Sequence, residues 1–346
     1  MSTATPRRSF LALTGAAALT LAGCARQGVG AAAAPTGALP TTAPPPGTRL
    51  SIAIHTTQIQ LEASGRIHDL PFTVSQWPNL TAGPDVIQGF RAKSVDLANN
   101  AGIPPIQASA IGLDTRIVAV RLSETPLYVF ATAPGSAVRD AADFRGKRIA
   151  FSQGQAQGVV VLRALKKAGI STEDVHLVPL PSTQFLTALQ ARQVDVAPLA
   201  EPTLTKYLTQ YRKDGARGIH TDVVDLLSIL WAPTEVLRDE ARTAAIRSFV
   251  PFWAQGQVWA YENPARWIEA YYVKDQGVTR ADGQRIVASL GKPCFPTSWD
   301  TAIAWEQQTS ELLTAGGFDP AVKAADLFDR RFEGIAAASV PSAYRK

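Results

Sequence analysis

The sequence of 346 residues contains few of the side chains that hold metal ions or attack substrates. Cysteine occurs only at Cys24 and Cys294, no Cys-x-x-Cys pair is present, and the four histidines follow no spacing typical of metal ligands. These shortages argue against a structural metal site and against a cysteine–histidine nucleophile pair. We therefore expect no metal, no cofactor and no enzymatic activity.

Charged residues are sparse and evenly scattered. They make up 18% of the chain, the formal net charge is +5, and like charges never occur five in a row. A protein that binds nucleic acid is expected to concentrate basic side chains in a stripe or patch. The sequence therefore predicts that nucleic acid is not a partner, and its apolar content of 46% predicts a globular body.

The N-terminal segment has no apolar run long enough to remain in a membrane. Residues 10–21 are apolar or small, whereas a membrane-spanning helix needs about 20 such residues. Two arginines precede the run, an order typical of an export signal peptide, here over residues 1–23. The letters RRSFL at residues 7–11 also resemble a twin-arginine export motif. Because any export signal carries positive charge there, the route, twin-arginine or general, stays open.

The signal is followed by a segment that suggests a membrane anchor. The apolar run ends in LAGC at residues 21–24, which resembles the lipobox of bacterial lipoproteins and implies cleavage before Cys24 and a lipid on its sulfur. Residues 25–48 contain five prolines, four glycines and one charged residue. Such a segment cannot bury enough apolar surface to offset the entropy lost on ordering. We expect residues 24–48 to form a disordered tether between the lipid and the folded body.

From residue 49 onward, segments typical of strands and helices alternate. Strand-like runs such as RLSIAIHT (49–56) and KRIAFSQ (147–153) alternate with segments of helical spacing such as QAQGVVVLRALKKAGI (155–170). This alternation predicts a parallel or mixed sheet that is covered by helices on both faces. From about residue 239 the pattern changes to helices rich in aromatic residues, which we expect to pack against the body.

Two short stretches recur at almost the same distance along the chain. FRAKSVDLANNA aligns with LQARQVDVAPLA at an offset of 99 residues, which places Asp96 on Asp195. SIAIHT aligns with RIAFSQ at an offset of 97, which places His55 on Ser152. The two matches predict two similar α/β lobes, although strand–helix units in general also look alike.

The phrase DFRGKRIAFSQGQAQGVVVLRALKKAGI and the order of elements resemble type 2 periplasmic substrate-binding proteins of ABC importers. The similarity covers about residues 49–333 and is strongest to the subfamily for aliphatic sulfonates, taurine, nitrate and thiamine-precursor pyrimidines. It implies an α/β, two-lobed, periplasmic-binding-protein-like type II fold with two strand crossovers as a hinge and a helical C-terminal region packed on lobe I. By that pattern lobe I comprises residues 49–131 plus 232–346, and lobe II comprises residues 132–231.

The resemblance implies a binding protein. We expect an exported lipoprotein, anchored to the outer face of the cell membrane through Cys24, that captures an aliphatic sulfonate, taurine or a similar small molecule between its lobes. It would be a monomer that delivers the ligand to the permease subunits of an ABC transporter. Two alternatives stay open: an enzyme of the same fold that makes pyrimidine precursors or cleaves carbon–sulfur bonds, and a ligand sensor for a membrane receptor. The export signal argues against the enzymes, because those relatives are cytoplasmic.

Candidate ligand-binding residues follow the carboxyl ends of the predicted strands, where open α/β sheets bind ligands and helices begin. By resemblance these positions line the cleft between the lobes. The candidates are His55, Thr56, Trp77, Asn99, Asn100, Ser152, Gln153, Gly154, Gln155, Ser182, Glu201 and Trp231. Backbone N–H groups at the helix start near Gly154 could hold an anion without an arginine, because the helix dipole favours negative charge there.

Several of these candidates also have a purely structural interpretation. Ser182 is a common helix N-cap residue, and Asn99 and Asn100 suit a turn. His55 has no neighbouring carboxylate or serine in the sequence that would suggest catalysis, so it is either a cleft residue or a buried, hydrogen-bonded histidine.

The two tryptophans and the glutamate raise a different question. Trp77 and Trp231 could stack on an organic ligand or pack between and within the lobes. Glu201 could complement the dipole of the helix that follows it. In the cleft, however, its carboxylate would repel a simple anion and favour a ligand that carries an amine, such as the zwitterion taurine or a basic heterocycle.

Overall fold

The computed structural model describes residues 37–346. The predicted signal peptide, the lipobox with Cys24 and the first half of the predicted tether lie outside these residues. Residues 37–48 form no helix or strand, and the side chain of Leu39 packs, partly buried, against the hydrophobic core. Within residues 37–346, no helix combines the length and the apolar composition that a membrane span requires.

The first sheet contains five strands in the order β2, β1, β3, β10 and β4. Strands β1 (Arg49–Ala53), β2 (Thr73–Gln76) and β3 (Leu97–Ala101) are parallel. Strand β10 (Leu227–Pro233) runs antiparallel to both of its neighbours, β3 and β4 (Thr115–Leu122). Almost every residue of β4 and β10 is buried, as expected for strands that are covered on both faces.

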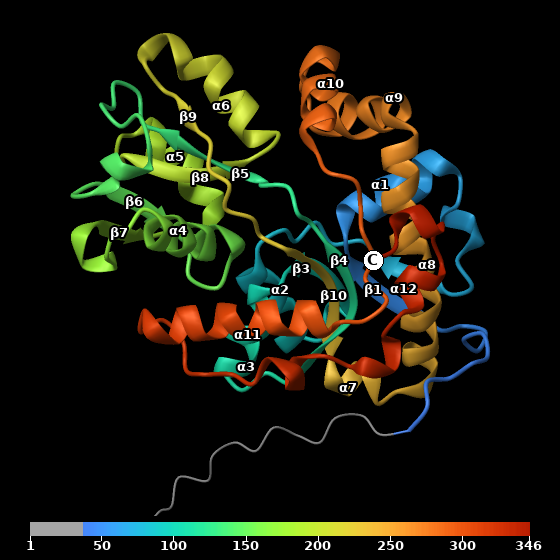
Figure 1. Ribbon diagram of the computed structural model, residues 1–346. Coiled ribbons are helices and arrows are strands. Elements are labelled where there is room, and N and C mark those ends of the chain that lie inside the picture. Colours follow the sequence, from blue (N-terminus) through green and yellow to red (C-terminus); the bar gives the residue numbers. More distant parts are fainter. Residues whose placement is uncertain (1–36) are drawn as a thin grey trace, which may run out of the picture. The chain divides into compact units, whose positions relative to one another are not determined.

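Helices cover both faces of this sheet (Figure 1). Helices α2 and α3 pack together on one face, and α1 packs with the long helix α8 on the other. The helices of this part are α1 (His55–Ser64), α2 (Gly83–Arg91), α3 (Ile103–Ala110), α7 (Thr234–Leu237), α8 (Glu240–Glu262) and α12 (Ile335–Ala338).

The second sheet also contains five strands, in the order β7, β6, β8, β5 and β9. Its strands are β5 (Tyr128–Thr132), β6 (Arg148–Phe151), β7 (His176–Pro179), β8 (Val196–Ala200) and β9 (Gly218–Ile219). Its helices are α4 (Ala156–Lys167), α5 (Phe185–Gln190) and α6 (Thr203–Tyr211). Four residues separate β6 from α4, whereas Ile54 alone separates β1 from α1.

The C-terminal region is helical. It contains α9 (Pro264–Trp267), the π-helix η6 (Ile268–Asp275), α10 (Arg280–Ser289) and α11 (Asp300–Ala315). Helices α9 and α10 and η6 contact one another and share a small hydrophobic cluster with α1. Helix α11 contacts both α3 and α4, so the C-terminal region touches helices of both sheets.

The chain crosses between the sheets twice. It leaves the first sheet after β4 through residues 123–127 and returns to it before β10 through residues 220–226. The sequence-based boundaries at 131/132 and 231/232 fall inside β5 and β10. The predicted α/β class, with two mixed sheets and a helical C-terminal region, is confirmed.

The internal repeat has a counterpart in the hydrogen bonds of the two sheets. Asp96 Oδ2 accepts a hydrogen bond of 2.8 Å from the backbone N–H of Ser51 in β1. Asp195 Oδ2 accepts one of 2.9 Å from the backbone N–H of Arg148 in β6. Ser51 and Arg148 are themselves 97 residues apart. The same contact between a carboxylate and a strand therefore occurs once in each lobe.

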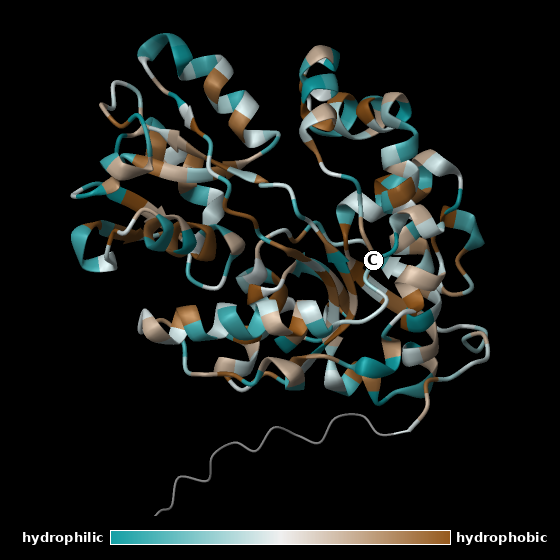
Figure 2. Ribbon diagram, viewed as in Figure 1, coloured by the Kyte–Doolittle hydropathy of each residue, from teal (hydrophilic) through white to brown (hydrophobic). Residues whose placement is uncertain are grey.

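Apolar side chains fill the space beneath both sheets. The largest cluster extends from Leu50 in the first sheet to Phe130 in the second, and another, around Phe185, lies entirely among elements of the second. In Figure 2 the strands of the first sheet are mainly brown, whereas helices such as α6 and α10 carry teal segments. This pattern is expected where strands are buried and helices have one face in water.

Candidate ligand-binding site

A cavity of about 350 Å³ lies where strand ends of the two sheets meet, and we call it the central cavity. Its walls come from both sheets: Ile54 and Asn99 follow or belong to strands of the first, and Tyr128 and Gln155 belong to or follow strands of the second. Tyr271 of η6 completes the lining from the C-terminal region. The cavity is thus formed by three separate parts of the chain.

Four helices begin at this cavity, two of them with proline in the first turn. The first residues of α1, α2, α3 and α4 all contribute to its lining, and none of these four helix starts has a hydrogen-bonded side-chain cap. The first N–H groups of a helix have no partner within the helix, and its dipole places partial positive charge at that end. Pro84, Pro104 and Pro105 have no N–H, so α1 and α4 supply most of the free donors, while the dipoles of all four helices favour an anionic group in the central cavity.

Six of the residues predicted from the sequence line the central cavity. They are His55, Thr56, Asn99, Asn100, Gln155 and Ser182.

Hydrogen bonds fix the polar side chains of the first sheet at the cavity. The Asn99 side-chain amide donates to the backbone oxygen of Ile229 over 2.7 Å. The Asn100 Oδ1 accepts from Trp231 Nε1 over 2.9 Å. Both asparagines lie in β3 and are oriented by β10, so they are held strand residues and not the turn residues that the sequence also allowed.

Trp231 and Ser152 do not line the cavity but hold residues that do. Trp231 is fully buried, so it packs in the core and orients Asn100. The buried Ser152 hydroxyl donates to Gln155 Oε1, which also accepts from the backbone N–H of Ser182 over 2.9 Å.

The remaining predicted residues of the α4 loop and β2 also lie outside the lining. Gln153 donates to the backbone oxygen of Phe318 over 2.6 Å. Trp77 is half-buried, and its ring centroid lies 6.2 Å from that of Phe249, so it packs against α8. Gly154 has φ of +76°, and a Cβ atom there would overlap the side-chain amide of Gln107. Glycine at this position therefore allows the loop before α4 to approach α3 closely.

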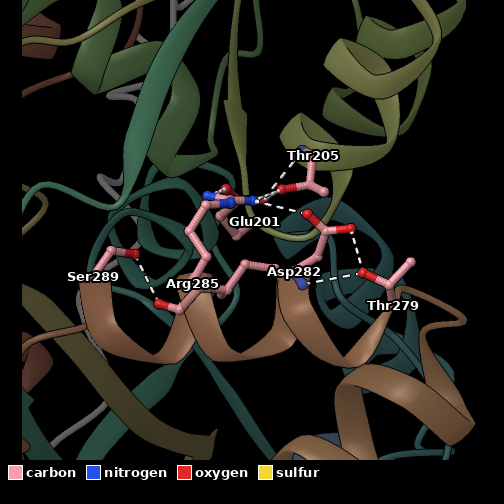
Figure 3. Close-up of polar contacts among 7 residues, drawn as sticks. Glu201, Thr205, Thr279, Asp282, Arg285 and Ser289 are labelled. Atoms are coloured by element: carbon pink, nitrogen blue, oxygen red, sulfur yellow. Dashed lines mark hydrogen bonds and ion pairs between the residues drawn. The ribbon is translucent and has the colours of Figure 1, made fainter.

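Glu201 has its own partners at the start of α6 (Figure 3). Its Oε2 accepts from the backbone N–H of Thr205 over 3.1 Å and from the Thr205 hydroxyl over 2.6 Å. Its Oε1 lies 3.1 Å from Nη1 of Arg285 in α10. The carboxylate complements the helix start, as one interpretation of the sequence proposed. Because Arg285 offsets its charge, Glu201 repels an anionic ligand less than the sequence alone suggested.

Sequence reasoning missed the contribution of the C-terminal region. His55 Nε2 lies 2.8 Å from Oδ1 of Asp275, a carboxylate 220 residues away. Burial, with a smaller effect of the Asp275 charge, raises the pKa of Tyr271 to about 12. Tyr271 lies in the stretch EAYYVKD, within the aromatic-rich region whose pattern predicts helices that pack against the body. Two tyrosines followed by a lysine and an aspartate were the available signal that this helix also has a polar, site-facing end.

The chain matches a family model described as NMT1/THI5 like over residues 80–266, which is more than half of its length. A putative aliphatic sulfonates-binding protein of Escherichia coli (strain K12) is 30% identical over 140 residues, which cover 40% of this chain and 44% of that protein. That match thus spans less than half of the relative. A protein of the same description from Bacillus subtilis (strain 168) is 21% identical over 74% of this chain and 76% of its own.

Solved structures show the same fold. The alkanesulfonate-binding protein of Xanthomonas axonopodis pv. citri, bound to MOPS, has a TM-score of 0.70 and 22% identity, over 88% of this chain and all of that chain. The desulfurization enzyme DSZB has a TM-score of 0.55 and 15% identity, over 85% of this chain and 99% of its own. Likeness at these identities shows the fold alone. The two-lobed periplasmic-binding-protein fold predicted from the sequence is confirmed.

Proposed function

Because the chain belongs to the NMT1/THI5-like family, we propose that it is an extracytoplasmic solute-binding protein that captures an organosulfonate and delivers it to an ABC permease. The observation that carries the proposal is the convergence of four uncapped helix starts, contributed by both lobes, on one cavity. A sulfonate has one negative charge and three oxygens, so it accepts several backbone N–H bonds at once. The names of the relatives from Escherichia coli and Bacillus subtilis support the same ligand class.

The proposed mechanism is closure of two lobes around the ligand. Lobe I would contain the first sheet and lobe II the second, close to the predicted bounds of 49–131 plus 232–346 and 132–231, with the crossing segments 123–127 and 220–226 as the hinge. His55, Thr56, Asn99 and Asn100 would meet the ligand from lobe I, and Gln155 and Ser182 from lobe II. The contact of Gly154 with Gln107 lets the lobes come together, and the closed form would be the one that the permease recognises.

Retention at the membrane is a separate part of the proposal. A lipid on Cys24, followed by the Pro/Gly-rich segment, would hold the binding protein at the outer face of the cell membrane. Stable anchoring needs more than one acyl chain, which a diacylglycerol thioether provides. We expect Cys24→Ser to release the protein from washed membranes, and full retention of that variant would contradict the anchor.

Titration calorimetry on the purified protein tests the proposed function. We expect ethanesulfonate and butanesulfonate to bind with a stoichiometry of one and to raise the melting temperature, since a ligand that binds only the folded form stabilises it. Sulfate, nitrate, taurine and a thiamine-precursor pyrimidine serve as comparison ligands. If a pyrimidine bound and no sulfonate did, the ligand class would be wrong while the fold assignment stood.

The fold shared with a desulfurization enzyme makes carbon–sulfur cleavage the second candidate. Burial raises the pKa of the Cys294 thiol, and this side chain is not part of the central cavity. A nucleophilic cysteine needs the opposite, a lowered pKa in an accessible site. We expect sulfonates and sulfinates to be recovered unchanged after incubation with the protein. Release of sulfite at catalytic protein concentrations would favour the enzyme, and a sensor role would leave ligand binding intact without a permease.

A further inference from the structure

A second cavity, of about 360 Å³, adjoins the central cavity, and we call it the aromatic cavity. Thr56, Asn99 and Tyr271 line both cavities, so the two meet at these side chains. Its wall contains four aromatic side chains: Tyr261, Trp267, Tyr271 and Tyr272. Aromatic walls of this kind suit a ring, because ring pairs attract one another beyond simple burial.

An arginine without a counter-charge lines the aromatic cavity. Arg121, near the end of β4, is part-buried, and its one hydrogen bond runs from Nη1 to Gln257 Oε1 over 3.4 Å. Its Nε is buried and has no partner. Within residues 37–346, no carboxylate lies within ion-pair distance of Arg121, although ten other arginines there make such pairs.

Glu201 is the one carboxylate in the lining of the aromatic cavity, and it is already engaged. Its oxygens are bound by Thr205 and by Arg285. Burial disfavours the charged form and lowers the pKa of Arg121, but a guanidinium remains charged at neutral pH. A part-buried cation whose one hydrogen bond is long and goes to a neutral group loses solvation free energy, unless an anion binds to it.

We propose that the aromatic cavity is a second subsite, which holds the far end of the ligand, and that Arg121 pairs there with a second anionic group. The inference rests on the proposed function, because the sulfonate of the same ligand would occupy the central cavity. The ligand class is then an aromatic sulfonate with a carboxylate on its ring. Its ring lies among the tyrosines and Trp267, and its carboxylate accepts two N–H bonds from the guanidinium.

Calorimetry with three sulfonates of increasing size tests this assignment on the purified full protein. The probes are ethanesulfonate, benzenesulfonate and para-sulfobenzoate, and the last two differ only in the carboxylate. We expect para-sulfobenzoate to bind at least about tenfold more tightly than benzenesulfonate, since hydrogen bonds to charged groups are among the strong ones. Arg121→Gln should abolish that preference while the affinity for benzenesulfonate stays within about twofold.

Two controls separate Arg121 from general charge and from folding. Lys213→Gln removes one exposed positive charge from the second lobe and should keep the full preference. In the unsubstituted protein, para-carbamoylbenzenesulfonate replaces the carboxylate with a neutral amide of the same shape and should bind about as weakly as benzenesulfonate. This ligand comparison needs no variant, so it stands even if Arg121→Gln does not fold.

The failures of the two proposals are distinct. If ethanesulfonate and benzenesulfonate bind but the carboxylate adds no affinity, the aromatic cavity is not a subsite for a second anion and the proposed function survives. The same conclusion follows if Arg121→Gln keeps the preference for para-sulfobenzoate. If none of the three sulfonates binds, the proposed function is wrong and this inference falls with it.

Discussion

Two groups of charged side chains connect the lobes, and water reaches them to very different degrees. The rim pair consists of Glu201 in lobe II and Arg285 in the C-terminal region, and Figure 3 shows their contact. Their side chains are 16% and 54% exposed, respectively. The basal cluster consists of Arg163 on α4, Glu306 on α11 and Asp225 in the second crossing segment. Glu306 is 1% exposed and Asp225 is 9% exposed.

The two groups also differ in how their charges are satisfied. In the rim pair, both carboxylate oxygens of Glu201 have partners. In the basal cluster, Glu306 Oε1 is buried without a hydrogen bond, and Arg163 donates to the Thr309 hydroxyl over 2.9 Å. Burial raises the pKa of Asp225 to about 7 and that of Glu306 to about 8, and the charge of Arg163 lowers both. We therefore expect the strength of the rim pair to depend on salt concentration. The contribution of the basal cluster to stability should instead depend on pH.

The largest effect is expected from removing the cation of the basal cluster. Arg163→Leu leaves two buried carboxyls without an opposite charge, which should lower the free energy of unfolding by about 3–5 kcal/mol at pH 8. The loss should be smaller at pH 5, because protonated carboxyls need no counter-charge. Urea denaturation at both pH values measures it. An equal loss at the two pH values would show that Arg163 acts by packing on Trp305 and not by charge.

The next effect is the pH dependence of the unsubstituted protein. Asp225 and Glu306 hold protons in the folded state that the unfolded chain has released above about pH 4. Unfolding then releases protons, so the free energy of unfolding should fall as pH rises from about 4 and should level off above about 7 and about 8, where the folded state has lost these protons too. Glu306→Gln keeps the shape of the protonated acid and should flatten this slope. Melting curves between pH 5 and pH 9 would contradict the assignment if the variant were the less stable protein at pH 9.

The close approach of Gly154 to Gln107 should give a smaller effect, and Gly169 provides a matched control. Gly154 and Gly169 both have positive φ, +76° and +66°, but only a Cβ at Gly154 would meet another side chain, that of Gln107. Both alanine variants should lose about 1–2 kcal/mol of stability from backbone strain. Only Gly154→Ala should also weaken ethanesulfonate binding, by about tenfold, because it holds the lobes apart. Equal binding by the two variants would remove this contact from the closure mechanism.

The smallest effect is expected at the rim. A double-mutant cycle with Glu201→Gln and Arg285→Gln should give a coupling below about 1 kcal/mol that declines with added salt. Ethanesulfonate affinity should change by less than about threefold in either variant. A taurine affinity that fell in Glu201→Gln alone would instead place this carboxylate against the amine of a ligand. A strong coupling that does not change with salt would show that the rim pair behaves like a buried ion pair, contrary to the contrast with the basal cluster.

Local sequence patterns predict the two-lobed fold, and six of the twelve residues that they single out line the central cavity. Strand and helix periodicity depends on neighbours in the chain, and the repeated Val-Asp motif correctly paired Asp96 with Asp195. Lys93 and Arg192, 99 residues apart, even share the unusual φ values of +55° and +54°. Residues at strand ends, such as Asn99 and Gln155, could be placed at the cavity because topology fixes where strand ends meet.

Contacts that join distant segments could not be predicted in the same way. His55 and Asp275 are separated by 220 residues, and Arg121 and Gln257 by 136. No periodicity indicates which face of α10 or η6 turns toward a lobe, because that depends on how the C-terminal helices pack on α1 and α8. For the same reason the sequence leaves both interpretations of Glu201 open, because it does not indicate that Arg285 of α10 pairs with this carboxylate.

The unequal loops after β1 and β6 give the central cavity a direction. One residue lies between β1 and α1 and four lie between β6 and α4, so the start of α1 presents the imidazole of His55 and the loop before α4 presents the amide of Gln155. The lining therefore has no two-fold symmetry, although the lobes that form it are similar. A ligand with two different ends should therefore bind in one preferred orientation. A ligand with two identical ends would find a different environment at each end.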